Sequence, residues 1–256
     1  MLSGTEFVRS LPTAATPARE RAIYDAVRAG NVAPLQWWPL RSTAAGRALV
    51  MFVMCDALRV GTATDSVRVT VNARTAQQIA DAYGCILPTT RICDLIWEQA
   101  LVRLTPCIGR ADAAMSTTAR MLGHHACVEG KLAGQRGLVE TVGKNWVITN
   151  HLATRPGRAA NYGWFDPKAP YGSKPGGRGP HRLWQPLGLA HDTRHVDYSQ
   201  IVRLVHRACT VEGVPRDLVE VLHDRELAPL ASDEGVMRVW RIPGVPLGEA
   251  LVSAAT

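Results

Sequence analysis

The chain has 256 residues, of which 46% are hydrophobic and 20% charged, and this composition is typical of a globular protein rather than a disordered one. Its longest apolar run, Ala48 to Cys55, is about eight residues long, whereas a membrane-spanning helix needs roughly 20. The formal charge of +7 is compatible with an anionic partner such as nucleic acid, anionic lipid or a wall polymer. No run of five or six consecutive basic residues is present, however.

The first 15 residues contain no apolar core behind a basic start, so no secretory signal peptide is visible. We therefore expect the chain to be cytoplasmic as synthesised, with export by a non-classical route as the alternative. No two cysteines form a C-x-x-C pair, and a chain of this size does not need disulfides to fold. The cysteines are accordingly expected to be thiols, most of them small buried side chains: Cys55, Cys85, Cys93, Cys107, Cys127 and Cys209.

The N-terminal region is expected to contain a flexible arm over residues 1–15, followed by one well-marked helix. Thr16 suits the N-cap of this helix, Pro17 suits its first position, and Gly30 ends it. Residues 31–45, which contain two prolines and a pair of tryptophans, are expected to form a loop.

The rest of the chain mixes apolar, strand-like runs with capped helical segments in no regular alternation. Strands are expected at residues 46–58, 66–71, 145–150, 159–163, 201–211 and 237–242. Helices are expected at residues 72–83, 89–104, 116–131 and 215–224, with Asn72 and either Thr89 or Thr90 as N-caps. Residues 165–180 are the longest Gly/Pro-rich stretch and are expected to form a long loop, and residues 246–256 a frayed tail.

This pattern predicts an α+β protein with a single mixed domain over residues 16–245, in which helices flank a central β-sheet. A G-x-G-x-x-G turn after a strand and a phosphate-binding P-loop are both absent from the sequence. The regular strand–helix alternation of a doubly wound fold is also missing, so that fold is disfavoured.

Residues 181–207 hold the densest set of groups that can transfer protons, attack a carbonyl or bind a metal. Four of the eight histidines lie here, together with two carboxylates, a tyrosine and a serine. They are His181, His191, Asp192, His195, Asp197, Tyr198, Ser199 and His206. We predict that a functional cleft is formed by residues 181–200 and the 165–180 loop.

One hypothesis is a cysteine–histidine centre. Cys85 precedes a helix whose unpaired N–H groups would stabilise a thiolate, with His191 as the base and Asp197 orienting it. The alternative is that Cys85 is simply a small core side chain. A second hypothesis uses Ser199 with His191 or His195, although no G-x-S-x-G turn is present and Ser199 could instead bond to backbone.

The spacing H-x-x-x-H-x-D in His191, His195 and Asp197 is compatible with zinc, but no H-E-x-x-H motif is present, and we expect neither a metal nor a cofactor. Trp164 and Trp184 flank the Gly/Pro-rich stretch, where aromatic rings at a rim can stack on sugars or bases. Ordinary packing is the alternative for both tryptophans.

Several segments together resemble a family of uncharacterised bacterial proteins, some of them linked with the cell wall. The resemblance covers roughly residues 20–235 and is carried by residues 68–100, 143–152, 161–164, 184–191 and 196–205. The matching positions are Gly84, Cys85, Leu87, Pro88, Thr89, Lys144, Asp197, Tyr198, Ser199, Arg203 and Leu204, whereas His195 and Ile201 depart from the pattern. The 197–203 run also resembles short motifs of NlpC/P60 peptidases and L,D-transpeptidases, with the nucleophilic cysteine missing in each case.

We expect a hydrolase or acyl-transferase that acts on amide bonds, such as those of peptidoglycan peptides. Cys85 or Ser199 would attack, His191 would act as base and then acid, and Asp197 would orient it. The expected substrate-binding residues are Lys144, Trp164, Trp184, Tyr198 and Arg203. The alternative is a non-enzymatic binding module for an anionic wall polymer or nucleic acid, without sequence-specific nucleic-acid recognition. The sequence does not indicate an oligomeric state.

Overall fold

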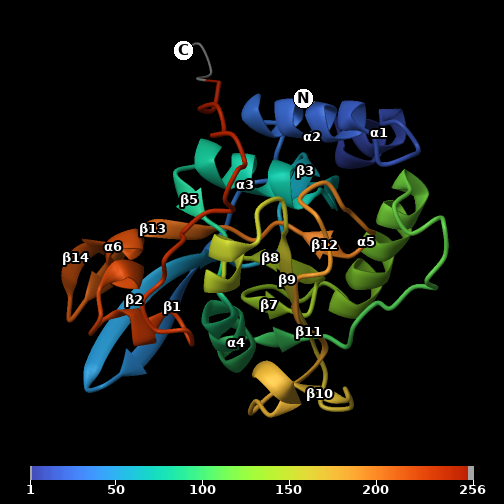
Figure 1. Cartoon of the computed structure of the whole chain (residues 1–256). Coiled ribbons are helices and arrows are strands. Elements are labelled where there is room, and N and C mark those ends of the chain that lie inside the picture. The colour runs from blue at the N-terminus through green and yellow to red at the C-terminus, as the bar shows by residue number, and fades with distance from the viewer. Residues whose placement is uncertain (1, 253–256) are drawn as a thin grey trace.

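Two five-stranded β-sheets form the framework of the computed structural model, which describes residues 2–252 (Figure 1). The first sheet has the order β1-β2-β13-β14, with β5 paired to β13, and each of these pairings is antiparallel. Its strands are β1 (Trp37–Ala44), β2 (Arg47–Met54), β5 (Cys85–Ile86), β13 (Val205–Val211) and β14 (Val214–Asp217). This sheet therefore joins the N-terminal and C-terminal thirds of the chain.

The second sheet has the order β10-β11-β9-β8-β12 and extends from the centre of the view in Figure 1, where β8, β9 and β12 lie, to the lower edge of the molecule, where β10 lies. Its strands are β8 (Lys144–Val147), β9 (Ala160–Phe165), β10 (Tyr171–Gly172), β11 (Arg182–Gly188) and β12 (Gln200–Ile201). Strand β12 runs parallel to β8 and pairs Gln200 with Lys144. This pairing brings the residues just before β12, which include Asp197 and Ser199, to the start of β8.

Two short ladders complete the strands of the described chain: β3 (Arg59–Gly61) with β4 (Ser66–Arg68), and β6 (Val102–Arg103) with β7 (Val139–Glu140). The α-helices are α1 (Gly4–Ser10), α2 (Pro17–Arg28), α3 (Ala73–Ala82), α4 (Thr90–Gln99), α5 (Thr118–Leu132) and α6 (Leu218–His223). Three 3₁₀ segments are η1 (Asn150–Thr154), η2 (Pro175–Gly177) and η3 (Ala228–Leu230). Helix α4 contacts both β1 and β9 and so links the two sheets.

The predicted α+β class is confirmed, and three of the predicted helix starts coincide with observed caps. The hydroxyls of Thr16 and Thr89 and the side-chain oxygen of Asn72 each accept a hydrogen bond from the backbone N–H three residues later. These bonds satisfy donors that the helix itself leaves unpaired. The caps therefore fix where α2, α3 and α4 begin.

Two of the predicted elements differ. Residues 31–45, expected as a loop, contain β1, which tolerates Pro39 because it lies at the sheet edge and needs no complete hydrogen-bond ladder. Residues 237–242, expected as a strand, form none; Ile242 donates its backbone N–H to the Gln77 side chain on α3 instead.

Both chain ends are more ordered than the sequence predicts. The expected flexible arm contains α1, whose Ser3–Glu6 capping box starts a helix that buries Phe7 and Val8. At the other end, Glu249 donates its N–H to the Tyr24 hydroxyl at 2.7 Å, so part of the predicted frayed tail lies along α2. The last four residues of that tail are outside the described residues.

Two further corrections concern the cysteines and the Gly/Pro-rich stretch. Cys107 and Cys127 form a disulfide, whereas all six cysteines were expected to be thiols; the pair lies 20 residues apart and is brought together only by the fold. The 165–180 stretch is not one unbroken loop, because it contains β10 and η2. Within residues 2–252, no helix has the length and apolar character needed to cross a membrane.

Candidate functional site

A buried ion pair lies where β8 meets the turn before β12. The Lys144 Nζ atom is 2.7 Å from Asp197 Oδ2, and both side chains are almost fully enclosed. The other carboxylate oxygen, Oδ1, accepts hydrogen bonds from the backbone N–H and the hydroxyl of Ser199, at 2.8 and 2.7 Å. Burial raises the pKa of Asp197, but the Lys144 charge and the Ser199 hydrogen bonds outweigh it and hold this pKa below its ordinary value.

Aromatic rings surround this ion pair. The Lys144 ammonium lies 5.0 Å from the Trp164 ring centroid, within cation–π range. The Tyr198 ring lies 6.3 Å from Trp164 and 5.4 Å from the edge-on His124 ring. Trp164 has a φ of +60°, which few side chains of its size adopt, and this backbone turn accompanies its placement beside Lys144.

Two of the histidines that the sequence singles out lie face to face. The rings of His191 and His195 are nearly parallel, with centroids 3.7 Å apart. The Asp192 carboxylate accepts the backbone N–H groups of Arg194 and His195 and so fixes the turn that carries the stack. Burial lowers the pKa of both imidazoles, and for His191 the neighbouring His195 lowers it further, so both rings are uncharged at neutral pH.

We use the term polar centre for Lys144, Trp164, Asp197, Tyr198 and Ser199 with His124, His191 and His195. Three enclosed ring nitrogens of this set have no hydrogen-bond partner among residues 2–252: His124 Nε2, His195 Nε2 and Trp164 Nε1. Buried polar atoms are usually paired, so an unpaired group indicates bound water, a ligand or a functional role. The centre thus has unused hydrogen-bonding capacity beside a fixed ion pair.

Neither proposed nucleophile is activated by an imidazole in this arrangement. The Ser199 hydroxyl donates to Asp197 rather than to a histidine, and the residue is fully buried. Cys85 lies on β5 in the other sheet and is 2% exposed. Burial raises the pKa of the Cys85 thiol to about 12, which is the opposite of the lowering expected from the adjacent helix start.

Two of the expected substrate-binding residues lie outside the polar centre. Arg203 is a correction, because it is 1% exposed and its guanidinium pairs with the buried Glu140 at 3.1 Å, which leaves it no access to a substrate. Trp184, on β11, is 39% exposed and donates its Nε1–H to Asp166 at 3.2 Å. The other three, Lys144, Trp164 and Tyr198, meet in the polar centre.

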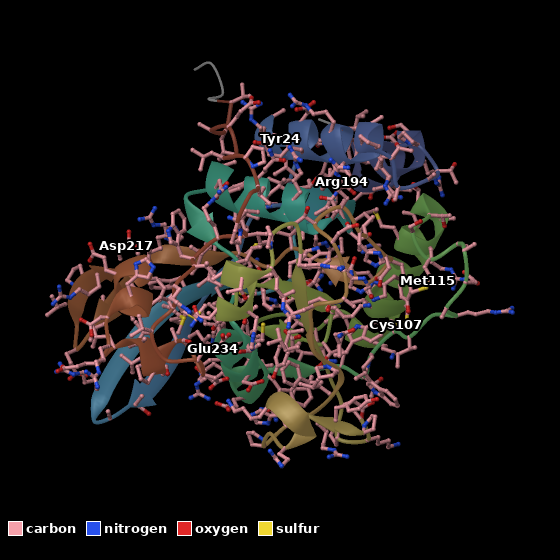
Figure 2. The ribbon with its side chains drawn as sticks, viewed as in Figure 1. Tyr24, Cys107, Met115, Arg194, Asp217 and Glu234 are labelled. Carbon is pink, nitrogen blue, oxygen red and sulfur yellow. A yellow bond between two sulfur atoms is a disulfide. The ribbon has the colours of Figure 1, made fainter. Side chains whose placement is uncertain are left out.

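Residues 190–198, which carry the stacked histidines and Asp197, also border a cavity of about 650 Å³. Arg194 and Val196 line it. Figure 2 shows Arg194 beside Tyr24 of α2, near the top of the view. The N-cap residues of α2 and α3, Thr16 and Asn72, line this cavity as well. We call it the basic cavity, because Arg21, Arg74 and Arg194 all lie on its wall.

The basic cavity is not apparent from the sequence. The two N-caps were visible as helix starts, but nothing in the sequence shows that two starts 56 residues apart open into one space.

Comparison of the chain with protein-family models, curated proteins and solved structures finds no match. Within residues 2–252, no group of three or more histidine, cysteine or acidic side chains is placed to hold a metal ion.

Proposed function

We propose that the chain is a binding module for an anionic cell-wall polymer and that the basic cavity holds the polymer's phosphate or carboxylate groups. The observation that carries this proposal is the convergence of three arginines on one cavity of about 650 Å³. That volume is in the range of ligand-binding pockets. The formal charge of +7 adds long-range attraction for such a polymer.

Two of the three arginines are available to a ligand. Arg21 pairs with Asp25 on α2 at 2.9 Å. Arg74 and Arg194 form no salt bridge with any carboxylate in residues 2–252, so their guanidinium groups can bind an anion in two-pronged geometry. The first turns of α2 and α3 line the same space, and their positive dipole ends favour negative charge; at α3 the Glu20 carboxylate, also on the cavity wall, already accepts the Asn72 N–H at 3.1 Å.

The Cys107–Cys127 disulfide supports a wall polymer over nucleic acid as the partner. Disulfides persist mainly in oxidising surroundings outside the cytosol. A basic protein in such a compartment meets wall polymers rather than chromosomal DNA. The same observation supports the export route over a purely cytoplasmic location.

The binding proposal predicts a measurable loss when the two available arginines are removed. Wild-type protein titrated with poly(glycerol phosphate) in a calorimeter is expected to bind, and the Arg74→Ala/Arg194→Ala variant to bind about 10- to 100-fold more weakly at low salt. A plot of log affinity against log salt concentration should become less steep, with its slope reduced in magnitude by about two. Each arginine neutralises one phosphate, and each lost phosphate contact reduces the slope by about one.

The matched control replaces two exposed arginines far from the basic cavity, Arg216→Ala/Arg225→Ala, which carry the same loss of net charge. Equal weakening in both double variants would mean that net charge, not the basic cavity, provides the affinity. Tighter binding of single-stranded DNA of equal length than of poly(glycerol phosphate) would contradict the wall-polymer assignment.

An amide hydrolase or acyl-transferase is the second candidate, favoured by the polar centre. His191 and His195 are neutral imidazoles beside a buried carboxylate, and a neutral imidazole can accept a proton from an attacking group. Against it, Cys85 and Ser199 are buried, and neither donates a hydrogen bond to an imidazole within the described chain: Cys85 donates to the Tyr83 carbonyl and Ser199 to Asp197, although His206 lies opposite Cys85 in the β5–β13 pairing.

Covalent labelling separates the two candidates. In the binding module, native protein is expected to give no fluorophosphonate adduct at Ser199 and no iodoacetamide adduct at Cys85 within an hour at pH 7.5, because both side chains are buried. In 6 M guanidinium all free cysteines should react. Mass spectrometry locates the adducts, and rapid native labelling of either residue would favour the enzyme.

A further inference from the structure

A second cavity, of about 310 Å³, lies at the opposite end of α5 from its N-cap. The apolar residues of its lining include Leu35, Leu132 and Val139. The charged residues of the lining include Asp56, Arg59 and Glu129. A small cavity lined by both apolar and charged side chains fits a ligand that has a hydrocarbon part and a charged part.

A buried arginine, Arg68, donates hydrogen bonds to both carboxylates of this cavity. Arg68, whose side chain is fully enclosed, donates its Nε–H to Asp56 Oδ1 at 2.8 Å and its Nη1–H to Glu129 Oε1 at 2.6 Å, and its Nη2 also contacts Asp56. Arg59 adds a hydrogen bond to the same Glu129 oxygen at 3.0 Å. The carboxylates are therefore fixed in place before any ligand arrives.

Both carboxylates are ionised at neutral pH. Burial raises the pKa of each, but the Arg68 charge outweighs it and holds the pKa of Asp56 and Glu129 below the ordinary values. The imidazole of His125, which faces the same network, stays neutral because burial and Arg68 lower its pKa to about 4. No positive histidine therefore competes for the carboxylates.

Two groups at this cavity keep free hydrogen-bonding capacity. Glu129 Oε2 accepts no hydrogen bond from any group in residues 2–252, and the Glu129 side chain is 36% exposed. Arg136, on the rim, is exposed, and its guanidinium donates only to the neighbouring Gln135 carbonyl within the described chain. The lining of the cavity thus offers one acceptor for a cation and one donor for an anion.

We propose that this cavity binds a free α-amino acid with an apolar side chain. The ammonium group would lie against Glu129 Oε2, the carboxylate against Arg136, and the side chain against Leu35, Leu132 and Val139. A polymer of anionic groups is disfavoured here, because two ionised carboxylates, Asp56 and Glu129, line the cavity. The site is separate from the basic cavity and does not depend on the proposed function.

L-leucine is the probe, and two blocked derivatives test its two charged ends. N-acetyl-L-leucine lacks the ammonium group and L-leucinamide lacks the carboxylate. In calorimetric titrations of the whole protein, each derivative is expected to bind at least about tenfold more weakly than L-leucine, which corresponds to the loss of one charge-assisted contact.

Two variants assign the contacts. Arg136→Ala, at an exposed position, should bind L-leucine and L-leucinamide alike, and Glu129→Gln should bind L-leucine and N-acetyl-L-leucine alike. Circular dichroism checks that Glu129→Gln is folded, since Glu129 also pairs with Arg68. The Arg74→Ala/Arg194→Ala variant should bind L-leucine as the wild type does, whatever it does to the anionic polymer. Absence of L-leucine binding by the folded wild type, or equal binding of the blocked derivatives, would overturn the proposal.

Discussion

Replacing Arg203 by methionine is expected to lower the free energy of unfolding by about 3–5 kcal/mol, the range for breaking a buried ion pair from one side. Arg203 Nη2 lies 3.1 Å from Glu140, and neither side chain has any exposed surface. The same guanidinium donates to the carbonyls of Met54 and Val139 at 3.0 and 2.9 Å. Methionine removes the donor to these carbonyls and the positive charge that favours ionised Glu140, so this buried acid must take up a proton at neutral pH. Urea unfolding followed by circular dichroism measures the loss.

The partner and a surface pair provide the controls. Adding Glu140→Gln to Arg203→Met removes the buried acid that has lost its partner and is expected to recover part of the loss. Arg207→Met breaks a half-exposed pair with Asp217 and should cost no more than about 1 kcal/mol. If Arg203→Met costs no more than Arg207→Met, the buried pair does not stabilise the fold in the way argued.

Replacing His124 by phenylalanine is expected to make the protein relatively more stable in acid. Burial lowers the pKa of His124 from 6.5 to about 4, and the nearby Arg68 charge is the second cause of this lowering. A histidine with a depressed folded pKa contributes stability that is present above pH 6.5 and is lost as the pH falls through about 4. Phenylalanine keeps an aromatic ring against Tyr198 but cannot take up a proton.

The variant must be compared with the wild type at each pH, because other groups titrate in the opposite sense. Burial raises the pKa of Glu140 to about 7 and that of Asp94 to about 6, so these two acids favour the folded state as the pH falls. The stability difference between His124→Phe and wild type should shift toward the variant by roughly 3 kcal/mol between pH 7 and pH 4. A difference that stays constant across this range would show that His124 does not titrate as inferred.

The helix starts could be predicted from sequence because the responsible interactions are local. Thr16, Asn72 and Thr89 each bond to a backbone group three residues away, which the sequence shows directly. Strand β1 was missed for the opposite reason. Its Pro39 is unsuitable for a central strand, and only the sheet order places it at an edge.

The candidate site was predictable in its members but not in its pairing. Lys144, Asp197 and Ser199 were all selected, yet the Lys144–Asp197 contact spans 53 residues and arises from the parallel β8–β12 pairing. Cys85 was selected for its helix start, and pairing of β5 with β13 buries it instead. Arg68 was not selected, because its two carboxylate partners are distant in sequence and ordinary in type.

The Cys107–Cys127 disulfide has a consequence for the segment that covers Tyr198. Residues 104–117 form neither helix nor strand, yet the Gly109 N–H donates to the Tyr198 hydroxyl at 2.6 Å and the Tyr198 N–H donates to the Met115 carbonyl at 2.8 Å. Figure 2 shows Cys107 and Met115 together on the α5 side of the molecule. Ordering an irregular segment costs roughly 1–2 kcal/mol of backbone entropy per residue. The cross-link closes residues 107–127, which comprise most of this segment and the first part of α5, into a covalent ring of about 20 residues, and this restricts the unfolded chain by an amount equivalent to about 3 kcal/mol. The disulfide thus adds to the two hydrogen bonds that hold this segment against Tyr198, because it lowers the conformational entropy of the unfolded chain.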